Sequence, residues 1–354
     1  MRRHVLALVS LVSLVAACGG EDAKPPVMPE PPPVATPPPP PTTEPAPAPA
    51  PAPKPSMAEL QQQQGLATAL EGLNGHDPKK FASVYADDAV ITVAGLNEVR
   101  GREAIAQNMA EWFETFKSVK LGFSRVWVKD DTLVLEWVIN GTPSGELFGV
   151  KGTEQPIGHY GLSIVQFNAD GKVAKESRYG ELGAVMTQIA GGKAKPRPIP
   201  PVPAKPEMIV AKEDASKNVE LAKATHAALE GKKEADFLAA LTDDIEHDGL
   251  VALDTTKGKA DAKKFFKDFT TAFPDAKFAT SRAVAVGDYV IAESVLQATH
   301  KGALGKIAAT KKPIAIHIVD VFKLKDGKVA RAWTYQLMDP LTHHVNFRSQ
   351  ATAL

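Results

Sequence analysis

A carboxyl side chain near the C-terminal end of the sequence stands inside an apolar pattern. Residues 314–324 alternate as a β-strand does, and this places Ile316, Ile318 and Phe322 on the same face as Asp320. A buried carboxylate is costly unless it has a partner or a raised pKa. If Asp320 is neutral, it is a hydrogen-bond donor to a carbonyl or enolate oxygen. Asp320 is therefore the first candidate for acid-base chemistry, in a cavity lined by those three apolar residues.

Asp248 is a second acid that we predict to work with Asp320. Histidines are a further source of acid-base or ligand contacts, and His300 is a candidate to line the same cavity. His317 has the opposite strand parity to Asp320, so its ring should point away from the cavity. Further candidates for ligand contact are Trp333, Tyr335, His159 and Ser163.

No motif for a metal or a cofactor accompanies these residues. The sequence has no glycine-rich phosphate loop and no Cys/His spacing typical of a metal site. Hydrogen-bonded or solvent-facing histidines are the simpler interpretation of the His residues. We therefore predict no metal and no cofactor.

The sequence repeats itself at an offset of 156 or 157 residues. Each copy has a Thr-x-x-Gly start, a Thr-x-x-Pro step, an alternating apolar strand, an Asp-Gly-Lys turn and a returning strand that ends in Tyr. A repeat of this length indicates a duplicated domain. The matching pairs are Gly145 with Gly302, Thr153 with Thr310, Pro156 with Pro313, Gly171 with Gly327, and Tyr179 with Tyr335.

Each copy is predicted to begin with helices and to continue as a meander of long strands. This order predicts an α+β class, with two tandem domains in which N-terminal helices pack on a curved antiparallel sheet. In the first copy we expect helices at 58–73, 78–86 and about 102–116, and strands at 89–93, 119–129, 132–140, 157–167 and 172–179. In the second we expect helices at 219–229, 236–241 and about 259–273, and strands at 283–286, 289–297 and 314–324.

Several short motifs of the first copy occur in the order and spacing of a known family. They are Tyr85-Ala86-Asp87-Asp88-Ala89-Val90, Arg100-Gly101-Arg102-Glu103-Ala104-Ile105, Gly141-Thr142-x-x-Gly145 and Asp170-Gly171-Lys172-Val173. Over residues 65–190 the chain resembles the SnoaL-like branch of the nuclear transport factor 2-like superfamily. The resemblance implies a cone of helices and bent sheet around an apolar cavity. Members include polyketide cyclases, ketosteroid isomerases, dehydratases and many proteins that are not enzymes.

The resemblance also implies roles for particular positions. In ketosteroid isomerases the acid that matches Asp320 stays protonated and donates to a developing oxyanion. The general-base Asp of that family falls at Val93 and at Gly249, with Asp248 one residue early. The oxyanion Tyr falls at Thr68 and at Ala224. The catalytic set is therefore incomplete in the second repeat.

In the first repeat the position of Asp320 is taken by Ser163. The first repeat therefore lacks both acids and the Tyr that the resemblance implies.

The first 18 residues have the pattern of a secretory signal. Arg2 and Arg3 precede an apolar run that is too short to span a bilayer, and the stretch 14–18, Leu-Val-Ala-Ala-Cys, resembles a bacterial lipobox. That resemblance implies a lipoprotein signal peptide at 1–18, with Cys18 lipidated as the mature N-terminus and anchored in a membrane. Gly19 rather than Asp follows, which in the enterobacterial sorting pattern indicates the outer membrane. The folded part would then lie in the periplasm or outside the cell.

Two proline-rich segments divide the rest of the chain. Residues 19–56 are dominated by Pro and Ala, and residues 192–206 form a shorter Pro-rich linker. Proline fixes φ and lacks a backbone donor, so both segments favour extended, polyproline-like chain. We therefore assign SnoaL-like domains to 57–191 and 207–354.

Charge and surface patterning bear on partners. Lys plus Arg and Asp plus Glu both number 41, and there is no basic patch, so no nucleic-acid partner is expected. The strand faces opposite the expected cavities are apolar, with Tyr160, Leu162 and Ile164 in one repeat and His317, Val319 and Val321 in the other. Exposed apolar faces usually mark interfaces. We therefore expect the repeats to pack sheet to sheet as an internal pseudo-dimer.

Three functions remain open on the sequence alone. The first is a lipid-anchored envelope protein that binds a small apolar ligand in a domain cavity without catalysis. The second is an acid-base enzyme of the polyketide-cyclase or ketosteroid-isomerase type that uses the second domain. The third is a structural or partner-binding envelope protein whose cavities are filled by its own side chains.

Overall fold

The structure is a computed structural model of the 354-residue chain. It describes residues 57–93, 98–147, 150–151, 154–180, 185, 188, 199–211, 214–248, 255–304 and 308–336. The predicted signal peptide, with Cys18, and the predicted linker 19–56 lie outside the described residues, as does Gly249. All of the described elements belong to the unit Lys54–Leu354.

The first repeat begins with α1 (Met57–Asn74) and α2 (Pro78–Ala82), and α3 (Arg102–Thr115) follows later. Asp77 caps α2, because its side chain accepts a hydrogen bond of 2.9 Å from the backbone N of Lys80. The helix predicted to reach residue 86 ends at Ala82 instead, and β1 (Tyr85–Val93) begins three residues later. Sheet pairing of Tyr85 with Val173 outweighs the local helical pattern there.

Seven strands form the first sheet, in the order β2-β1-β8-β7-β4-β3-β9. The long strands pair antiparallel, as the meander pattern predicts, but β1 pairs with β8 and β3 with β9 in parallel. The sheet is therefore mixed, and it takes in residues 207–210, which the sequence analysis assigned to the second repeat. The bounds are β2 Glu98–Arg100, β3 Phe116–Lys129, β4 Thr132–Pro143, β7 Ile157–Phe167, β8 Val173–Gly180 and β9 Glu207–Val210, and β5 (Glu146–Leu147) pairs separately with β6 (Val150–Lys151).

The second repeat has the same plan. Its six-stranded sheet runs β11-β10-β15-β14-β13-β12, which is the order of the first sheet without β9. The shared topology confirms the duplication and the α+β class. The elements are η1 Ser216–Asn218, α5 Val219–Glu230, α6 Glu234–Ala239, β10 Leu241–Asp248, β11 Thr256–Lys257, α7 Gly258–Ala272, β12 Lys277–Val286, β13 Tyr289–Thr299, β14 Pro313–Lys325 and β15 Lys328–Gln336.

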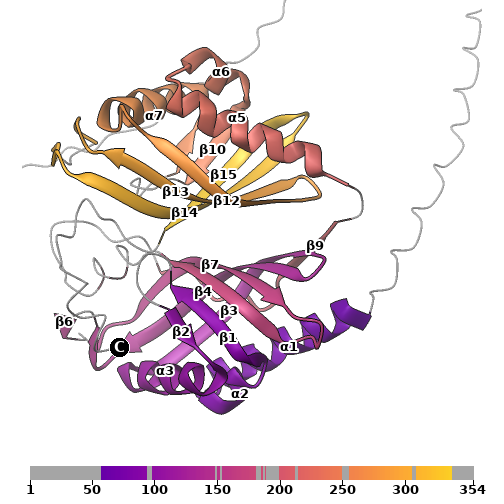
Figure 1. Cartoon of the computed structure of the whole chain (residues 1–354). Helices are drawn as coiled ribbons and strands as arrows, with labels where there is room; N and C mark the ends of the chain where they lie inside the picture. The colour runs from indigo at the N-terminus through magenta and orange to yellow at the C-terminus, as the bar shows by residue number, and fades with distance from the viewer. Residues whose placement is uncertain are drawn as a thin grey trace, which may run out of the picture. The chain divides into compact units, whose positions relative to one another are not determined.

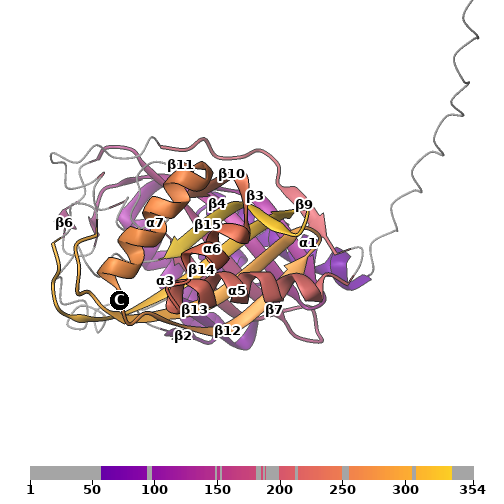
Figure 2. The ribbon, with the colours of Figure 1, turned by 90° about the horizontal axis from the view of Figure 1, so that it is seen from above.

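In each repeat the helices cover one face of the sheet. Figure 1 shows α1, α2 and α3 against the first sheet, and Figure 2 shows α5, α6 and α7 lying over the strands of the second. A separate apolar core fills the space between helices and sheet in each repeat. Any ligand cavity of the cone must therefore open within these two cores.

A third apolar cluster lies on the other faces of the two sheets and draws on both repeats. It includes Leu162 and Ile164 from β7 with Val319 and Val321 from β14. Ile318 and Phe322, the strand neighbours of opposite parity, belong instead to the core of the second repeat. The alternation read from the sequence thus separates the two faces of β14.

None of the described helices is both long and apolar enough to cross a membrane.

Candidate functional site

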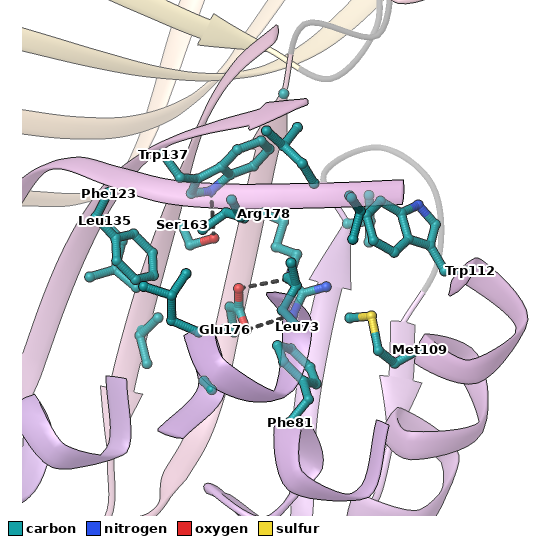
Figure 3. A pocket seen from close by; sticks show the side chains of 18 of the residues that line it. Leu73, Phe81, Met109, Trp112, Phe123, Leu135, Trp137, Ser163, Glu176 and Arg178 are labelled. Atoms are coloured by element: carbon teal, nitrogen blue, oxygen red, sulfur yellow. Dashed lines mark hydrogen bonds and ion pairs between the residues drawn. The ribbon is translucent and has the colours of Figure 1, made fainter. Parts of the chain in front are cut away.

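The first repeat encloses a cavity of about 370 Å³ between its helices and the concave face of its sheet. Most of its lining is apolar, and the side chains come from α1, α2 and α3 as well as from the strands. Figure 3 shows several of these wall residues, among them Leu73, Phe81, Met109, Trp112, Phe123 and Leu135. The volume falls within the range of small-molecule sites, roughly 300–1,000 Å³.

A buried polar centre in this wall is built from Tyr85, Glu176 and Arg178, and the lining also includes the polar residues Asn108, Glu111, Thr115 and Asn140. Arg178 Nε donates to Glu176 Oε1 at 2.7 Å, and Arg178 Nη2 donates to Glu176 Oε2 at 3.1 Å. The Tyr85 hydroxyl donates to Glu176 Oε2 at 2.5 Å and accepts from Arg178 Nη2 at 3.2 Å. Figure 3 shows the Glu176–Arg178 pair beside Phe81. The three side chains form a closed hydrogen-bonded group.

The strand geometry explains how these side chains meet. Glu176 and Arg178 are two residues apart on β8, so both project to the helix side of the sheet. Tyr85 begins β1, the parallel neighbour of β8, just before a register shift between Tyr85 and Val90. The centre therefore needs the parallel β1–β8 pairing, which the strand pattern does not predict.

The pKa shifts define the charges of this centre. Burial alone would raise the pKa of Glu176, but the Arg178 guanidinium and the Tyr85 hydroxyl hold the pKa of that carboxyl below its usual value. Burial and the Glu176 carboxylate raise the pKa of Tyr85 well above its usual value. Burial would lower the pKa of Arg178, and the charge of Glu176 reverses this and raises it. At neutral pH the centre is an anion, a cation and a neutral phenol, so its net charge is zero.

Two sequence candidates, His159 and Ser163, also line this cavity. Ser163 Oγ accepts from Trp137 Nε1 at 3.1 Å, and the Ser163 hydroxyl bonds to Glu176, which helps to lower the pKa of that carboxyl. Burial lowers the pKa of His159 to about 4, although a hydrogen bond to the Tyr160 carbonyl opposes the shift. The His159 ring is therefore neutral at pH 7.

The second repeat holds a much smaller cavity, of about 70 Å³. Phenylalanine rings occupy much of the corresponding space, and the centroids of neighbouring rings lie 5.3–6.3 Å apart, a spacing at which aromatic pairs attract. These rings belong to Phe237, Phe265, Phe266, Phe269 and Phe278. Phe278 in β12 corresponds to Leu121 in β3. Phe278 pairs with Leu296, which pairs with Ile316 of β14, and Leu121 pairs with Ile139, which pairs with His159 at the equivalent position of β7. Larger side chains thus reduce the second cavity.

Asp320 lines this smaller cavity and has two partners there. His226 Nε2 lies 3.0 Å from Asp320 Oδ2, and the Thr334 hydroxyl donates to Asp320 Oδ1 at 2.5 Å. The His226 ring stacks on Phe278 with a centroid distance of 4.2 Å. His247 Nε2 lies 3.3 Å from the Thr334 hydroxyl and extends the network. The buried Asp320 carboxyl thus has hydrogen-bonding partners in the structure.

The other candidates of the second repeat are divided between several places. Ile318 and Phe322 line the smaller cavity with Asp320, whereas Ile316 is a core residue outside the described lining. Asp248 Oδ2 accepts from Arg331 Nη2 at 2.8 Å and is not part of that lining.

Three aromatic candidates lie away from the cavity as well. His300 is fully buried against Phe273, and its Nδ1 is bonded by Thr310. Trp333 and Tyr335 lie with the third cluster on the opposite face of the sheet. On β15 the side chains of Trp333 and Tyr335 point to the face opposite to that of Thr334, which lines the cavity.

The two repeats place different polar groups at equivalent positions. Ser163 faces Arg178 across β7 and β8, just as Asp320 faces Thr334 across β14 and β15. In the first repeat Ile91 of β1 pairs with Glu176 of β8, and at the equivalent place in the second repeat His247 of β10 pairs with Ala332 of β15. The first repeat therefore has an ion pair where the second has Ala332 and Thr334. The duplicated sites have diverged in chemistry as well as in size.

Sequence reasoning did not find Tyr85, Glu176, Arg178 or His226. A comparison of the returning strands contains a signal for two of them: Glu176 and Arg178 share the parity of a buried face, and their counterparts Ala332 and Thr334 are uncharged. His226 shares the buried face of α5 with Ala222 and Leu229. Among the described residues no group of three or more His, Cys, Asp or Glu is placed to hold a metal ion.

A cone of helices and mixed sheet around an apolar cavity defines the class of this fold. The family model of the SnoaL-like polyketide cyclases matches residues 64–189 and 219–341. The chain therefore belongs to the SnoaL-like polyketide cyclase family, in two tandem copies.

Solved structures with a similar fold each cover about one repeat. A putative SnoaL-like polyketide cyclase from Jannaschia sp. CCS1 is 21% identical, with 39% of this chain and 98% of that chain covered and a TM-score of 0.37. AclR, a putative hydroxylase from Streptomyces galilaeus, is 21% identical, with coverages of 38% and 98% and a TM-score of 0.34. A putative polyketide cyclase from Xanthomonas campestris pv. campestris is 17% identical, with coverages of 37% and 98% and a TM-score of 0.35. No curated protein matches the chain.

Proposed function

We propose that this protein binds a small, mostly apolar molecule in the cavity of its first repeat and performs no chemistry on it. The observation that carries the proposal is the pair of cavity volumes, about 370 Å³ in the first repeat and about 70 Å³ in the second. The larger cavity has the size and the apolar lining with few polar groups that ligand sites have. The smaller one has room for a few water molecules only.

The two buried carboxyl groups, Glu176 and Asp320, support binding rather than acid-base catalysis. A general base needs a pKa near the working pH and a free lone pair toward the substrate. Glu176 has a lowered pKa and already accepts from Tyr85 and from two nitrogens of Arg178. In the second repeat, Asp320 is bonded to His226 and Thr334 within a cavity too small for a substrate.

Filling the larger cavity should abolish binding. Leu135 lines it, and Leu135→Trp places an indole in the space that a ligand would take. We expect the neutral fluorescent probe N-phenyl-1-naphthylamine to bind the wild-type protein and to bind Leu135→Trp at least about tenfold more weakly, which is about 1.4 kcal/mol. Fluorescence titration measures both affinities.

Ile318→Val is the matched control, because Ile318 lines only the second cavity among the described residues. This change should cost about 0.5–1.5 kcal/mol of stability and leave probe affinity unchanged. Equal affinities of wild type and Leu135→Trp, or no probe binding by wild type, would contradict the proposal.

We also propose that the protein is a lipid-anchored component of the cell envelope. The support is the signal pattern that ends at Cys18, with Gly19 next, followed by a Pro/Ala-rich segment long enough to hold a folded domain away from a membrane. Cys18→Ser should abolish incorporation of labelled fatty acid and release the protein into the soluble fraction. A Cys18→Ser protein that stays with the membranes would disprove the anchor.

The packing of the two repeats as a pseudo-dimer is a further proposal, and buried polar contacts support it in addition to the third cluster. Arg125 and Glu136 form a buried ion pair on the first sheet, and the hydroxyl of Tyr335 from the second sheet donates to Glu136. The Arg125 guanidinium stacks over Trp333 at 3.8 Å from the ring centroid. The Tyr179 hydroxyl donates to Glu293 Oε1 at 2.5 Å.

These contacts lead to an expectation for the shape in solution. Separating the sheets would expose Leu162, Ile164, Val319 and Val321 and remove the hydrogen bond that Tyr335 donates to Glu136. Small-angle scattering of residues 57–336 should therefore give the compact profile of a single particle. A profile of two independently moving domains would contradict the packing.

A further inference from the structure

The proline-rich segment that follows the first repeat does more than connect the two repeats. We infer that residues 199–211 are a clamp: they dock on the first sheet through non-covalent contacts and hold the second repeat on a short tether. The two repeats then stay paired within one chain. This inference goes beyond ligand binding, and only its last step rests on the pseudo-dimer packing proposed above.

Two glycines of the first sheet form the track on which the clamp lies. A Cβ atom at Gly122 would lie 2.4 Å from the Pro203 carbonyl oxygen and 2.8 Å from Val202 Cγ1. A Cβ atom at Gly158 would lie 2.6 Å from Ile199 Cγ2. The contact at Gly122 is with the backbone of the segment, so a larger residue there would push the segment off the sheet.

Hydrogen bonds and apolar contacts hold the segment at both ends. Near its start, Asn140 Nδ2 donates to the Pro200 carbonyl at 3.0 Å, and Pro200 is buried. Near its end, β9 adds a parallel strand beside β3 at the edge of the first sheet. Ile209 and Ala211 pack against the third cluster. The segment is thus bound to the first repeat from its start to its end.

The second repeat has no such track within the described part of the chain. The strand register matches Gly122 to Ala279 and Gly158 to Ala315, and both alanines are exposed. In the described second sheet β12 is the edge strand, whereas β9 covers the equivalent β3 in the first. The clamp is therefore a feature of one repeat, and the duplication alone does not account for it.

The clamp leaves very little chain between the repeats. It ends at Ala211, and η1 of the second repeat begins at Ser216. Residues 212–215 lie between them and can span at most about 14 Å. Without the clamp the tether would begin at Gly180, where β8 ends. The effective concentration of the two sheet faces falls steeply with tether length, so its loss would lower that concentration by roughly tenfold or more.

Hydrogen exchange on the intact chain tests whether the segment is docked. The backbone amides of residues 207–210 that pair with β3 should exchange at least about tenfold more slowly than those of unstructured chain, because exchange requires the strand to detach. Gly122→Val should remove this protection. Ala279→Val, at the equivalent exposed position of the second repeat, should keep it. Unprotected amides in the wild-type protein, or protection that survives Gly122→Val, would refute the clamp.

Two alternative cuts in the folded chain test whether the clamp holds the repeats together. A protease site inserted after Gly191 leaves residues 199–211 joined to the second repeat, and a site inserted after Lys212 leaves them joined to the first. Only the first cut leaves the clamp linking the two halves. The protein cut after Gly191 should therefore have a Kd for dissociation of the halves at least about tenfold lower, which is about 1.4 kcal/mol. Sedimentation over a dilution series measures both values.

The same two variants assign the difference between the cut proteins. Gly122→Val should bring the two Kd values to within about twofold, and Ala279→Val should keep them about tenfold apart. Equal Kd values for the two cut wild-type proteins would refute the clamp and leave the packing of the sheets standing. Independently moving domains in the scattering profile of the uncut chain would instead refute the packing, and hydrogen exchange would still decide the docking of residues 199–211.

Discussion

Arg178→Met is expected to lower the free energy of unfolding by about 3–5 kcal/mol, because removal of one member of a buried ion pair leaves an uncompensated charge. The remaining charge would be the Glu176 carboxylate, whose side chain is only 7% exposed. It would keep the Tyr85 hydroxyl as a donor but lose both guanidinium bonds. Urea-induced unfolding measures the change in stability.

Two controls accompany this prediction. Glu176→Gln/Arg178→Met removes both charges and should recover most of the lost stability, since a buried ion pair replaced by neutral groups is often close to neutral. Lys80→Met breaks a surface pair with Glu71, in which the two side chains are 44% and 65% exposed, and should change stability far less, because exposed ion pairs contribute little. A loss for Arg178→Met no larger than that for Lys80→Met would show that the centre is solvated rather than buried.

Asp320→Ala is expected to cost about 2–5 kcal/mol of unfolding free energy while leaving probe binding unchanged. Asp320 is 7% exposed, and its removal leaves the His226 ring nitrogen unsatisfied and the Thr334 hydroxyl with a longer contact to His247, at about 1–3 kcal/mol for each group that loses its partner. Asp320→Asn keeps an oxygen for Thr334 and should cost less. Thermal unfolding and probe titration on both variants separate stability from binding.

This prediction chooses between the two roles that the sequence left open for Asp320. A structural role requires a change in stability with no change in ligand affinity. If Asp320→Asn abolished binding of the probe and left stability intact, Asp320 would be a ligand-contacting acid, and the assignment of the binding site to the first repeat would be wrong.

Local patterns in the sequence predict most of the fold. The duplication, the α+β class and the long strands follow from periodicity and from turn residues, which are local properties. The helix predicted over 78–86 fails at Tyr85 because a long-range pairing with Val173 decides that position. The parallel partners β1 and β8 are separated by most of the repeat, and no local pattern encodes their contact.

The site was harder to predict than the fold, for two physical reasons. First, a cavity is the space that packing leaves unfilled. Its volume depends on the sizes of single side chains, such as Leu121 in the first repeat and the larger Phe278 at the equivalent position of the second, and not on any motif. Second, Tyr85 and Glu176 meet only through the β1–β8 pairing. Asp320 is visible in the sequence because it interrupts an apolar strand, but its partner His226 belongs to a distant helix.

The number of apolar molecules that one chain binds tests the central claim most directly. Native mass spectrometry of residues 57–336 with a series of N-phenyl-1-naphthylamine concentrations counts bound molecules without assuming a site. Because only the first repeat has a cavity large enough among the described residues, we predict saturation at one molecule per chain, and no bound molecule for Leu135→Trp. Saturation at two molecules per chain, or equal occupancy of wild type and Leu135→Trp, would contradict the account.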